Sequence, residues 1–281
     1  MKIFLTGGTG FVGGYFINCA HIGGHTVLAM RRPNSIPRIP LAREPIWVEG
    51  NYQCIPMDIL RTCDVLVHLA AHSANVPYDK LCECLEENVV GPLKLGELAV
   101  KAGIKKFVIA GTCFEYGRAA ERYEKIPYNA PLEPTQSYAI SKAAASVAWM
   151  GFARMENVRL TVMRIFHVYG EGEPEGRLWP TLRKLSAVGS DMDMTLGDQI
   201  RDFVPVVTVA RQLLAEAESP CAKEGVPIVR HIGSGKPQSV RAFAETVWKE
   251  AGGSGQLRFG ALPYRPAEVM RFVPEIDDQG K

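Results

Sequence analysis

The sequence lacks long apolar runs and blocks of basic residues. No apolar stretch approaches the roughly 18 residues that a membrane-spanning helix requires. Residues 1–6 run directly into glycines, without the order of a secretory signal. The formal net charge of +2 is too small for the broad basic field that would hold a polyanion. We therefore expect a soluble cytoplasmic protein that acts on neither membranes nor nucleic acid.

Paired cysteines at a metal-binding spacing are also missing. The seven cysteines are scattered, and Cys82 and Cys84 have no second pair at the spacing of a zinc ribbon. His68 and His72 resemble a helical metal pair, but residues 64–71 form an apolar run typical of a strand. On a strand the two rings would lie too far apart to share a metal. We expect no metal site.

The chain does contain an alternation of short apolar runs with longer helical periods. Strands are expected at residues 2–6, 26–30, 64–70, 106–110 and 159–165, and helices at residues 10–22, 81–102 and 137–155. This alternation predicts an α/β fold with a doubly wound parallel sheet and helices on both faces. A length of 281 residues and an apolar content of 47% suit one such domain with a smaller appendage.

After about residue 170 the regular alternation of predicted strands and helices ends. A polar loop at residues 171–176 precedes a helical stretch at 178–188; residues 203–218 have a helical second half, and 226–232 are typical of a strand. We expect a dinucleotide-binding domain at residues 1–165, to which 203–235 return, and a substrate-binding cap at 166–202 and 236–281. This small interleaved cap would cover the carboxyl ends of the strands, where ligands bind in open α/β sheets.

A glycine-rich segment joins the first predicted strand to the first predicted helix. Its glycines let the backbone turn tightly and approach a pyrophosphate, whose charge is met by free amides and the positive helix end. A plain glycine turn is the alternative, but the position within the first strand–turn–helix unit predicts dinucleotide binding. The expected contacts are Gly7, Thr9, Gly10, Phe11, Val12 and Gly13.

The glycine spacing resembles that of extended short-chain dehydrogenases, the NAD-dependent epimerase/dehydratase type that modifies nucleotide sugars. Further family-like segments follow in order, at residues 58–59, 68–71, 88–91, 138–142, 164–170 and 201–204. Together they span residues 1 to about 235. The resemblance implies a Rossmann fold, a nicotinamide coenzyme, a nucleotide-sugar substrate and a homodimer.

Two arginines, Arg31 and Arg32, end the second predicted strand, where a coenzyme without a 2′-phosphate would meet an acid that binds both ribose hydroxyls. Their guanidiniums offer paired donors to a phosphate, and no carboxylate stands nearby in the sequence. A solvated basic turn is the alternative, but the position favours NADP(H). The resemblance implies further coenzyme contacts, with Asp58 and Ile59 at the adenine and Leu69, Ala70, Ala71 and Ile165 along the cleft.

Tyr138 and Lys142 stand four residues apart in a predicted helix and therefore share one face. An ammonium near a phenol favours the ionised phenol, which would lower the Tyr138 pKa from about 10 toward the range of efficient proton transfer. In the family that the chain resembles, a Ser or Thr four residues before a Tyr-Gly pair hydrogen-bonds the reacting oxygen, and Thr112 holds that place. Thr112, Tyr138 and Lys142 are the predicted catalytic residues, and the last two also bind the coenzyme.

Four residues are candidates for substrate contacts. Arg201 lies in a segment that resembles the one by which family members bring an arginine to the substrate diphosphate. His167 stands where many members have Asn, and it is either a second proton donor or a ring packed under the cap. Cys113 and Phe114 occupy the places of the Asp-Glu pair with which the family's dehydratases transfer protons.

Three reactions compete within this family. A thiol and a phenyl ring do acid/base work poorly, so dehydration is disfavoured. Net reduction draws hydride from the NADPH pool, whereas an epimerase recycles a tightly held NAD, so the two arginines favour a reductase. The sequence thus predicts NADPH-dependent reduction of a nucleotide-linked 4-keto-6-deoxy sugar, a 4-ketoreductase step of deoxysugar biosynthesis. A nucleotide-sugar 4-epimerase with retained NAD(P) and a non-catalytic NADP-binding sensor or scaffold remain open.

Overall fold

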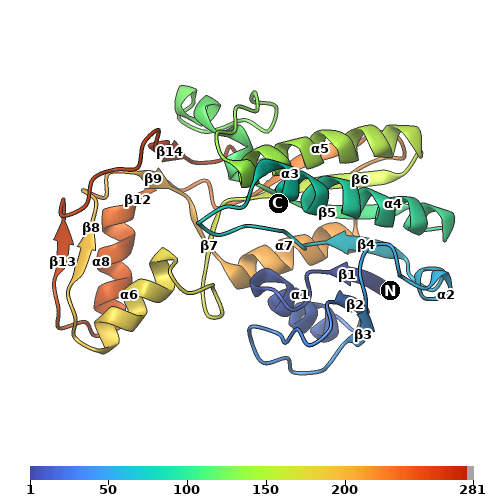
Figure 1. Cartoon of the computed structure of the whole chain (residues 1–281), viewed down its shortest axis with the longest axis horizontal. Helices are drawn as coiled ribbons and strands as arrows, with labels where there is room; N and C mark the ends of the chain where they lie inside the picture. Colours follow the sequence, from blue (N-terminus) through green and yellow to red (C-terminus); the bar gives the residue numbers. More distant parts are fainter. Residues whose placement is uncertain (277–281) are drawn as a thin grey trace.

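The computed structural model describes residues 1–276, which form one large sheet beside a smaller C-terminal part (Figure 1). The seven strands of the large sheet are β1 (Lys2–Thr6), β2 (Thr26–Arg31), β3 (Ile46–Glu49), β4 (Val65–His68), β5 (Lys106–Thr112), β6 (Arg159–Ile165) and β11 (Ile228–Ile232). All neighbours pair in parallel, in the order β11-β6-β5-β4-β1-β2-β3. The predicted parallel sheet is confirmed.

Helices cover both faces of this sheet (Figure 1). One face packs against α1 (Phe11–Ile22) and α7 (Val206–Glu218), and the other against α4 (Gly91–Lys101) and α5 (Ser137–Met155). Successive strand residues point to opposite faces, so Leu5 lies in the first core and Phe4 in the second. Burial on both faces explains why these strands are apolar throughout.

The strand order reverses between β1 and β4. From β1 the chain moves outward to β2 and β3, whereas from β4 it moves the other way to β5 and β6. Connections on opposite faces then diverge, and a crevice opens at the carboxyl ends of the two central strands. Side chains that directly follow β1, β4 and β5 therefore face a common space.

The smaller part is built from segments that leave the sheet and return to it. Its elements are β7 (His167–Tyr169), α6 (Leu178–Ala187), β8 (Met192–Met194), β9 (Ile200–Arg201), β10 (Phe203–Pro205), β12 (Gln238–Ser239), α8 (Val240–Glu250), β13 (Leu257–Phe259) and β14 (Arg271–Phe272). They pair as β10-β7, β12-β9-β14 and β13-β8. Leu182, Met194, Phe243 and Trp248 form a separate core there. We propose for the folded chain the same division into coenzyme domain and cap.

Most predicted elements occur within two residues of their expected bounds, and three details differ. The predicted helix over 81–102 consists of α3 (Leu81–Leu85), a π-helical turn (Glu86–Val90) and α4. The edge strand β3 and the short α2 (Met57–Leu60) had no clear pattern in the sequence. Across residues 1–276, no helix combines the length and apolar content needed to cross a membrane.

Candidate active site

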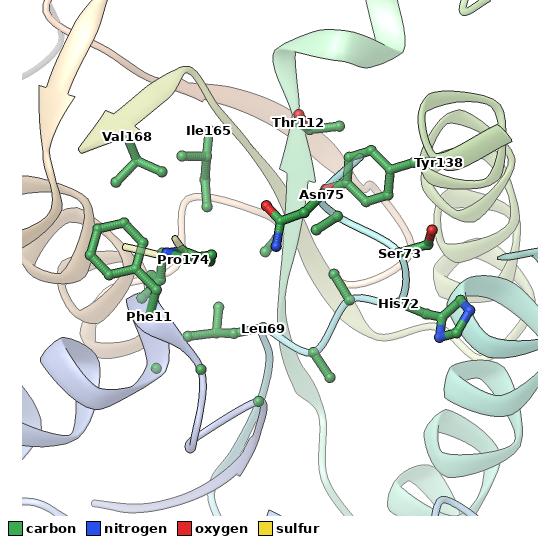
Figure 2. Close-up of a pocket in the computed structure, with 18 of the residues that line it drawn as sticks. Phe11, Leu69, His72, Ser73, Asn75, Thr112, Tyr138, Ile165, Val168 and Pro174 are labelled. Carbon is green, nitrogen blue, oxygen red and sulfur yellow. The ribbon is translucent and has the colours of Figure 1, made fainter. Parts of the chain in front are cut away.

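A cavity of about 1120 Å³ lies at the carboxyl ends of the central strands. Figure 2 shows Thr112 and Tyr138 on one side of it and Phe11, Val168 and Pro174 on the other. The structure brings most of the predicted site residues into its wall, namely Gly7, Thr9, Gly10, Phe11, Val12, Gly13, Arg32, Leu69, Ala70, Ala71, Thr112, Cys113, Phe114, Tyr138, Lys142, Ile165 and His167.

The turn between β1 and α1 has room only for glycine at two positions. Gly7 has a φ of +76°, and a Cβ there would lie 2.6 Å from the Ala70 nitrogen. A Cβ on Gly13 would overlap the Gly7 carbonyl oxygen. No side chain of the described residues caps the start of α1 at Gly10, so its amides can meet an anion. These residues fit the pyrophosphate of a dinucleotide.

The two arginines at the end of β2, Arg31 and Arg32, have different surroundings. Arg31 lies opposite Glu49 in the β2–β3 register, and its Nη2 is 2.8 Å from Glu49 Oε1. The expectation that no carboxylate stands near Arg31 is therefore wrong, because β3 brings one from eighteen residues away. Arg32 instead lines the cavity, together with Arg38 and Ser35.

Two residues expected at the adenine do not line the cavity. Asp58 lies in the first turn of α2 with its side chain exposed, and Ile59 follows it. The structure brings Tyr52, which lies between β3 and α2, into the wall instead. Tyr52 could be predicted only after β3 had been recognised, because the loop that carries it starts at the end of that strand.

The two residues of α5 predicted to be catalytic, Tyr138 and Lys142, lie one turn apart. Lys142 is buried, and its Nζ donates a hydrogen bond to the Ala110 carbonyl oxygen of β5 at 2.7 Å. The Tyr138 ring stacks on Tyr78, with 6.0 Å between ring centroids. Burial raises the Tyr138 pKa above its usual value, and the Arg177 guanidinium opposes this rise. Burial therefore dominates the pKa of Tyr138, in place of the lowering expected from Lys142.

Thr112 and Cys113 end β5 at the same wall. The Thr112 hydroxyl oxygen accepts the Phe114 amide at 3.4 Å, so its hydrogen can be donated to a substrate oxygen. Cys113 is 1% exposed, and burial raises the pKa of its thiol to about 12. The thiol therefore stays protonated near neutral pH and cannot act as a base there.

A second cavity of about 370 Å³ adjoins the first under the cap. Phe114, His167, Val168, Glu173 and Arg177 line both cavities. Arg201 lines the second, but its Nη2 donates to Glu268 Oε1 at 3.0 Å and to the Val269 carbonyl oxygen at 2.7 Å. Arg177 and Arg265 supply further guanidiniums to the same wall. The predicted anchor therefore lies in the expected cavity with part of its hydrogen-bonding capacity already used.

His167 is held among aromatic rings. Its ring meets those of Phe114, Phe203 and Phe272 with centroids 5.5, 6.1 and 5.8 Å away. Burial and the cations Arg201 and Arg177 hold its pKa well below the usual range. The neutral ring suits packing under the cap better than proton donation from an imidazolium.

Sequence comparison agrees with this geometry. Residues 3–229 match the NAD dependent epimerase/dehydratase family. The chain belongs to this family. Membership of this family accounts together for the parallel sheet, the glycine turn and the Tyr–Lys pair on α5. The chain is therefore an NAD(P)-dependent enzyme that acts on a nucleotide sugar.

Members of the epimerase/dehydratase family with different reactions are similar to this chain. A CDP-abequose synthase of Salmonella muenchen is 26% identical over 96% of this chain and 87% of that protein. A dTDP-6-deoxy-L-talose 4-dehydrogenase (NAD(+)) of Aggregatibacter actinomycetemcomitans is 23% identical, over 96% and 98%. The solved structure of an NAD-dependent NDP-hexosamine 5,6-dehydratase of tunicamycin biosynthesis has a TM-score of 0.84 and 27% identity, over 98% and 88%.

Proposed function

We propose that this chain reduces a nucleotide-linked 4-keto-6-deoxy sugar with NADPH. The observation that carries the proposal is the wall around the end of β5, where Thr112 and Tyr138 flank a protonated Cys113 thiol and an apolar Phe114. This set can donate hydrogen bonds and one proton to a carbonyl oxygen, but the two residues after Thr112 lack a carboxylate for elimination chemistry. One relative is named as a 6-deoxy-sugar 4-dehydrogenase, and this name supports a reaction at C4 of a 6-deoxy sugar.

In the proposed mechanism, Thr112 and Tyr138 hold the C4 oxygen of the substrate. The Thr112 hydroxyl donates a hydrogen bond that stabilises the charge developing on this oxygen. Tyr138, kept protonated by its burial, transfers its phenolic proton to the same oxygen. When bound, the nicotinamide coenzyme supplies the hydride. Lys142 holds α5 against β5 through its hydrogen bond to the Ala110 carbonyl oxygen.

The substrate diphosphate would lie toward the second cavity. Arg201 is the anchor expected from the sequence, but it is paired with Glu268. Arg177, which is paired with Glu173 at 3.3 Å, lines this second cavity and also the one that Thr112 and Tyr138 line. We therefore propose that Arg177 shares the diphosphate with Arg201.

Deuterium transfer separates the proposed reductase from the alternatives. With NADPH deuterated at the transferred position, we expect one deuterium at C4 of every product molecule and one NADPH consumed per product. Mass spectrometry and NMR of the product, with absorbance of the reduced nicotinamide, measure both quantities. Product that forms without NADPH loss and without label at C4 would establish the epimerase instead. Coenzyme binding without turnover of any 4-keto-6-deoxy sugar nucleotide would favour a sensor or scaffold.

Coenzyme choice can be tested at the end of β2. Replacing Arg32 and Arg38 with Ala removes two guanidiniums that line the cavity, and NADPH affinity should fall about ten- to a hundredfold while NADH affinity changes little. The matched control is Arg31→Ala, which removes a guanidinium paired with Glu49 and should leave the preference unchanged. Titrations of both coenzymes measure the affinities. Unaltered NADPH binding in the double variant would contradict selection by these residues.

A further inference from the structure

A fully buried carboxylate lies directly behind the catalytic residues. Glu115 has 0% exposure and follows Thr112 in the 3-10 turn Cys113–Tyr116. Its Oε1 accepts the backbone N–H of Thr112 at 2.8 Å, and its Oε2 accepts the hydroxyl of Ser146 at 2.7 Å. Ser146 lies one turn after Lys142 on α5. One carboxylate thus joins the end of β5 to the helix that carries Tyr138 and Lys142.

An arginine holds Glu115 from the opposite side. The Arg164 Nε donates to Glu115 Oε2 at 2.8 Å, and the two side chains are 3% and 0% exposed. Arg164 Nη1 also donates to the Tyr116 hydroxyl at 2.7 Å and to the Tyr128 carbonyl oxygen at 3.1 Å. Both charges are therefore desolvated and paired with each other, and a buried ion pair of this kind often adds little to net stability.

The backbone leaves space for this carboxylate. A Cβ on Gly111 would lie 2.7 Å from Glu115 Oε1 and 3.0 Å from the Arg164 Cγ. Any larger residue at position 111 would push the carboxylate away from the Thr112 amide. The space at Gly111, the ion pair with Arg164 and the hydrogen bond from Ser146 together define one position for the Glu115 carboxylate.

We propose that Glu115 is a positioning residue that orients Thr112 and, through Ser146, holds a negative charge behind the α5 residues Tyr138 and Lys142. The proposal rests on the catalytic roles given to Thr112, Tyr138 and Lys142 above. Through Oε1 it holds the backbone from which the Thr112 hydroxyl projects, and through Ser146 it holds α5 at a fixed distance from β5. Its negative charge favours the protonated form of both residues on α5, which suits a site that must donate a proton.

The charges around the two α5 residues are consistent with this role. Lys142 is buried, which lowers its pKa, and Glu115 raises it again. Burial, and after it the Lys142 ammonium, lower the pKa of the His68 ring to about 3. Around Tyr138, Arg177 lowers the pKa of the phenol, whereas Glu115, Cys113 and Tyr78 raise it. Glu115 is the group common to both residues.

Two single substitutions compare loss of the Glu115 charge with loss of its contact to α5. Glu115→Gln removes the negative charge, so the titration midpoint of Lys142 in the coenzyme-bound protein should fall by about one pH unit or more. Ser146→Ala removes only the hydrogen bond to α5 and should leave that midpoint unchanged. Both variants should lower kcat, by about tenfold or more for Glu115→Gln, because the catalytic groups lose their alignment. The exposed pair of Glu133 and Arg122 supplies the control Glu133→Gln, which should change neither quantity.

The Lys142 midpoint is read by NMR from protein labelled at the lysine Cε, with the resonance assigned through Lys142→Met. This measurement needs no sugar substrate, so its outcome is separate from that of the deuterium experiment. If Glu115→Gln does not fold, the variant that replaces both Glu115 and Arg164 with Gln removes the two buried charges together. Loss of the Arg164 cation opposes the effect of losing the Glu115 carboxylate, but Glu115 is the charge that acts on Lys142, so the midpoint should still fall, by less than in the single variant. An unchanged Lys142 midpoint in a folded protein that lacks the Glu115 carboxylate would overturn the proposal.

Discussion

Replacing Tyr138 with Phe is expected to lower kcat by about a hundredfold or more, while the coenzyme still binds. The change removes one hydroxyl and keeps the ring that stacks on Tyr78, so the wall of the cavity retains its shape. A hundredfold loss corresponds to about 2.7 kcal/mol in the barrier, a typical contribution of one positioned acid. Because the ring at this position is buried, the Phe side chain leaves little room for a water molecule to take the place of the hydroxyl.

Steady-state turnover and coenzyme titration of the same preparation measure the two quantities in this Tyr138 experiment. Tyr128→Phe, at a tyrosine that is 46% exposed, is the matched control and should behave like the unmodified protein. Turnover of Tyr138→Phe within a fewfold of that control would show that another group donates the proton.

Replacing Gly13 with Ala should weaken coenzyme binding by about a hundredfold or more, about 2.7 kcal/mol. The added Cβ would overlap the Gly7 carbonyl oxygen, so either the turn or the start of α1 must move. Such a movement takes the free amides away from the pyrophosphate. In the unmodified protein, NADPH at a hundred times its Kd should add about 2.7 kcal/mol of stability.

Thermal unfolding with and without NADPH measures this stabilisation directly. The Gly13→Ala protein should unfold at nearly the same temperature in both samples. Gly151→Ala is the matched control, because its Cβ enters open space on α5 and should leave the NADPH effect intact. A full NADPH-induced rise in Tm for Gly13→Ala would refute the role of this turn as the phosphate cradle.

The sequence was most informative where function requires neighbouring residues. Gly7 and Gly13 belong to one turn, and Tyr138 and Lys142 to one turn of one helix, so spacing alone predicts that they act together. The same holds for β1 and β6, whose apolar runs end where the strands end. Local pattern and tertiary structure agree at these places because each element is buried on both faces.

Pairings between distant segments could not be predicted in this way. Glu49 reaches Arg31 only through the β2–β3 register, and Glu268 reaches Arg201 from sixty-seven residues away. The Glu115–Arg164 pair depends on β5 lying beside β6. Each of these carboxylates changes what its arginine can do, and none has a local signal. The homodimer, the NADPH preference and the sugar stay predictions.

The order of the segments along the chain has a consequence for how the protein is made. The β1 turn is synthesised first, whereas β14 is added some 260 residues later and completes the strand pairing around β9. Phe272 of β14 contacts the rings of Phe114 and His167. A growing chain on the ribosome therefore has its phosphate-binding turn long before the aromatic wall of the second cavity is sheltered. Until β14 is added, these rings lack the cover of Phe272, and exposed apolar surface of this kind favours aggregation of incomplete chains.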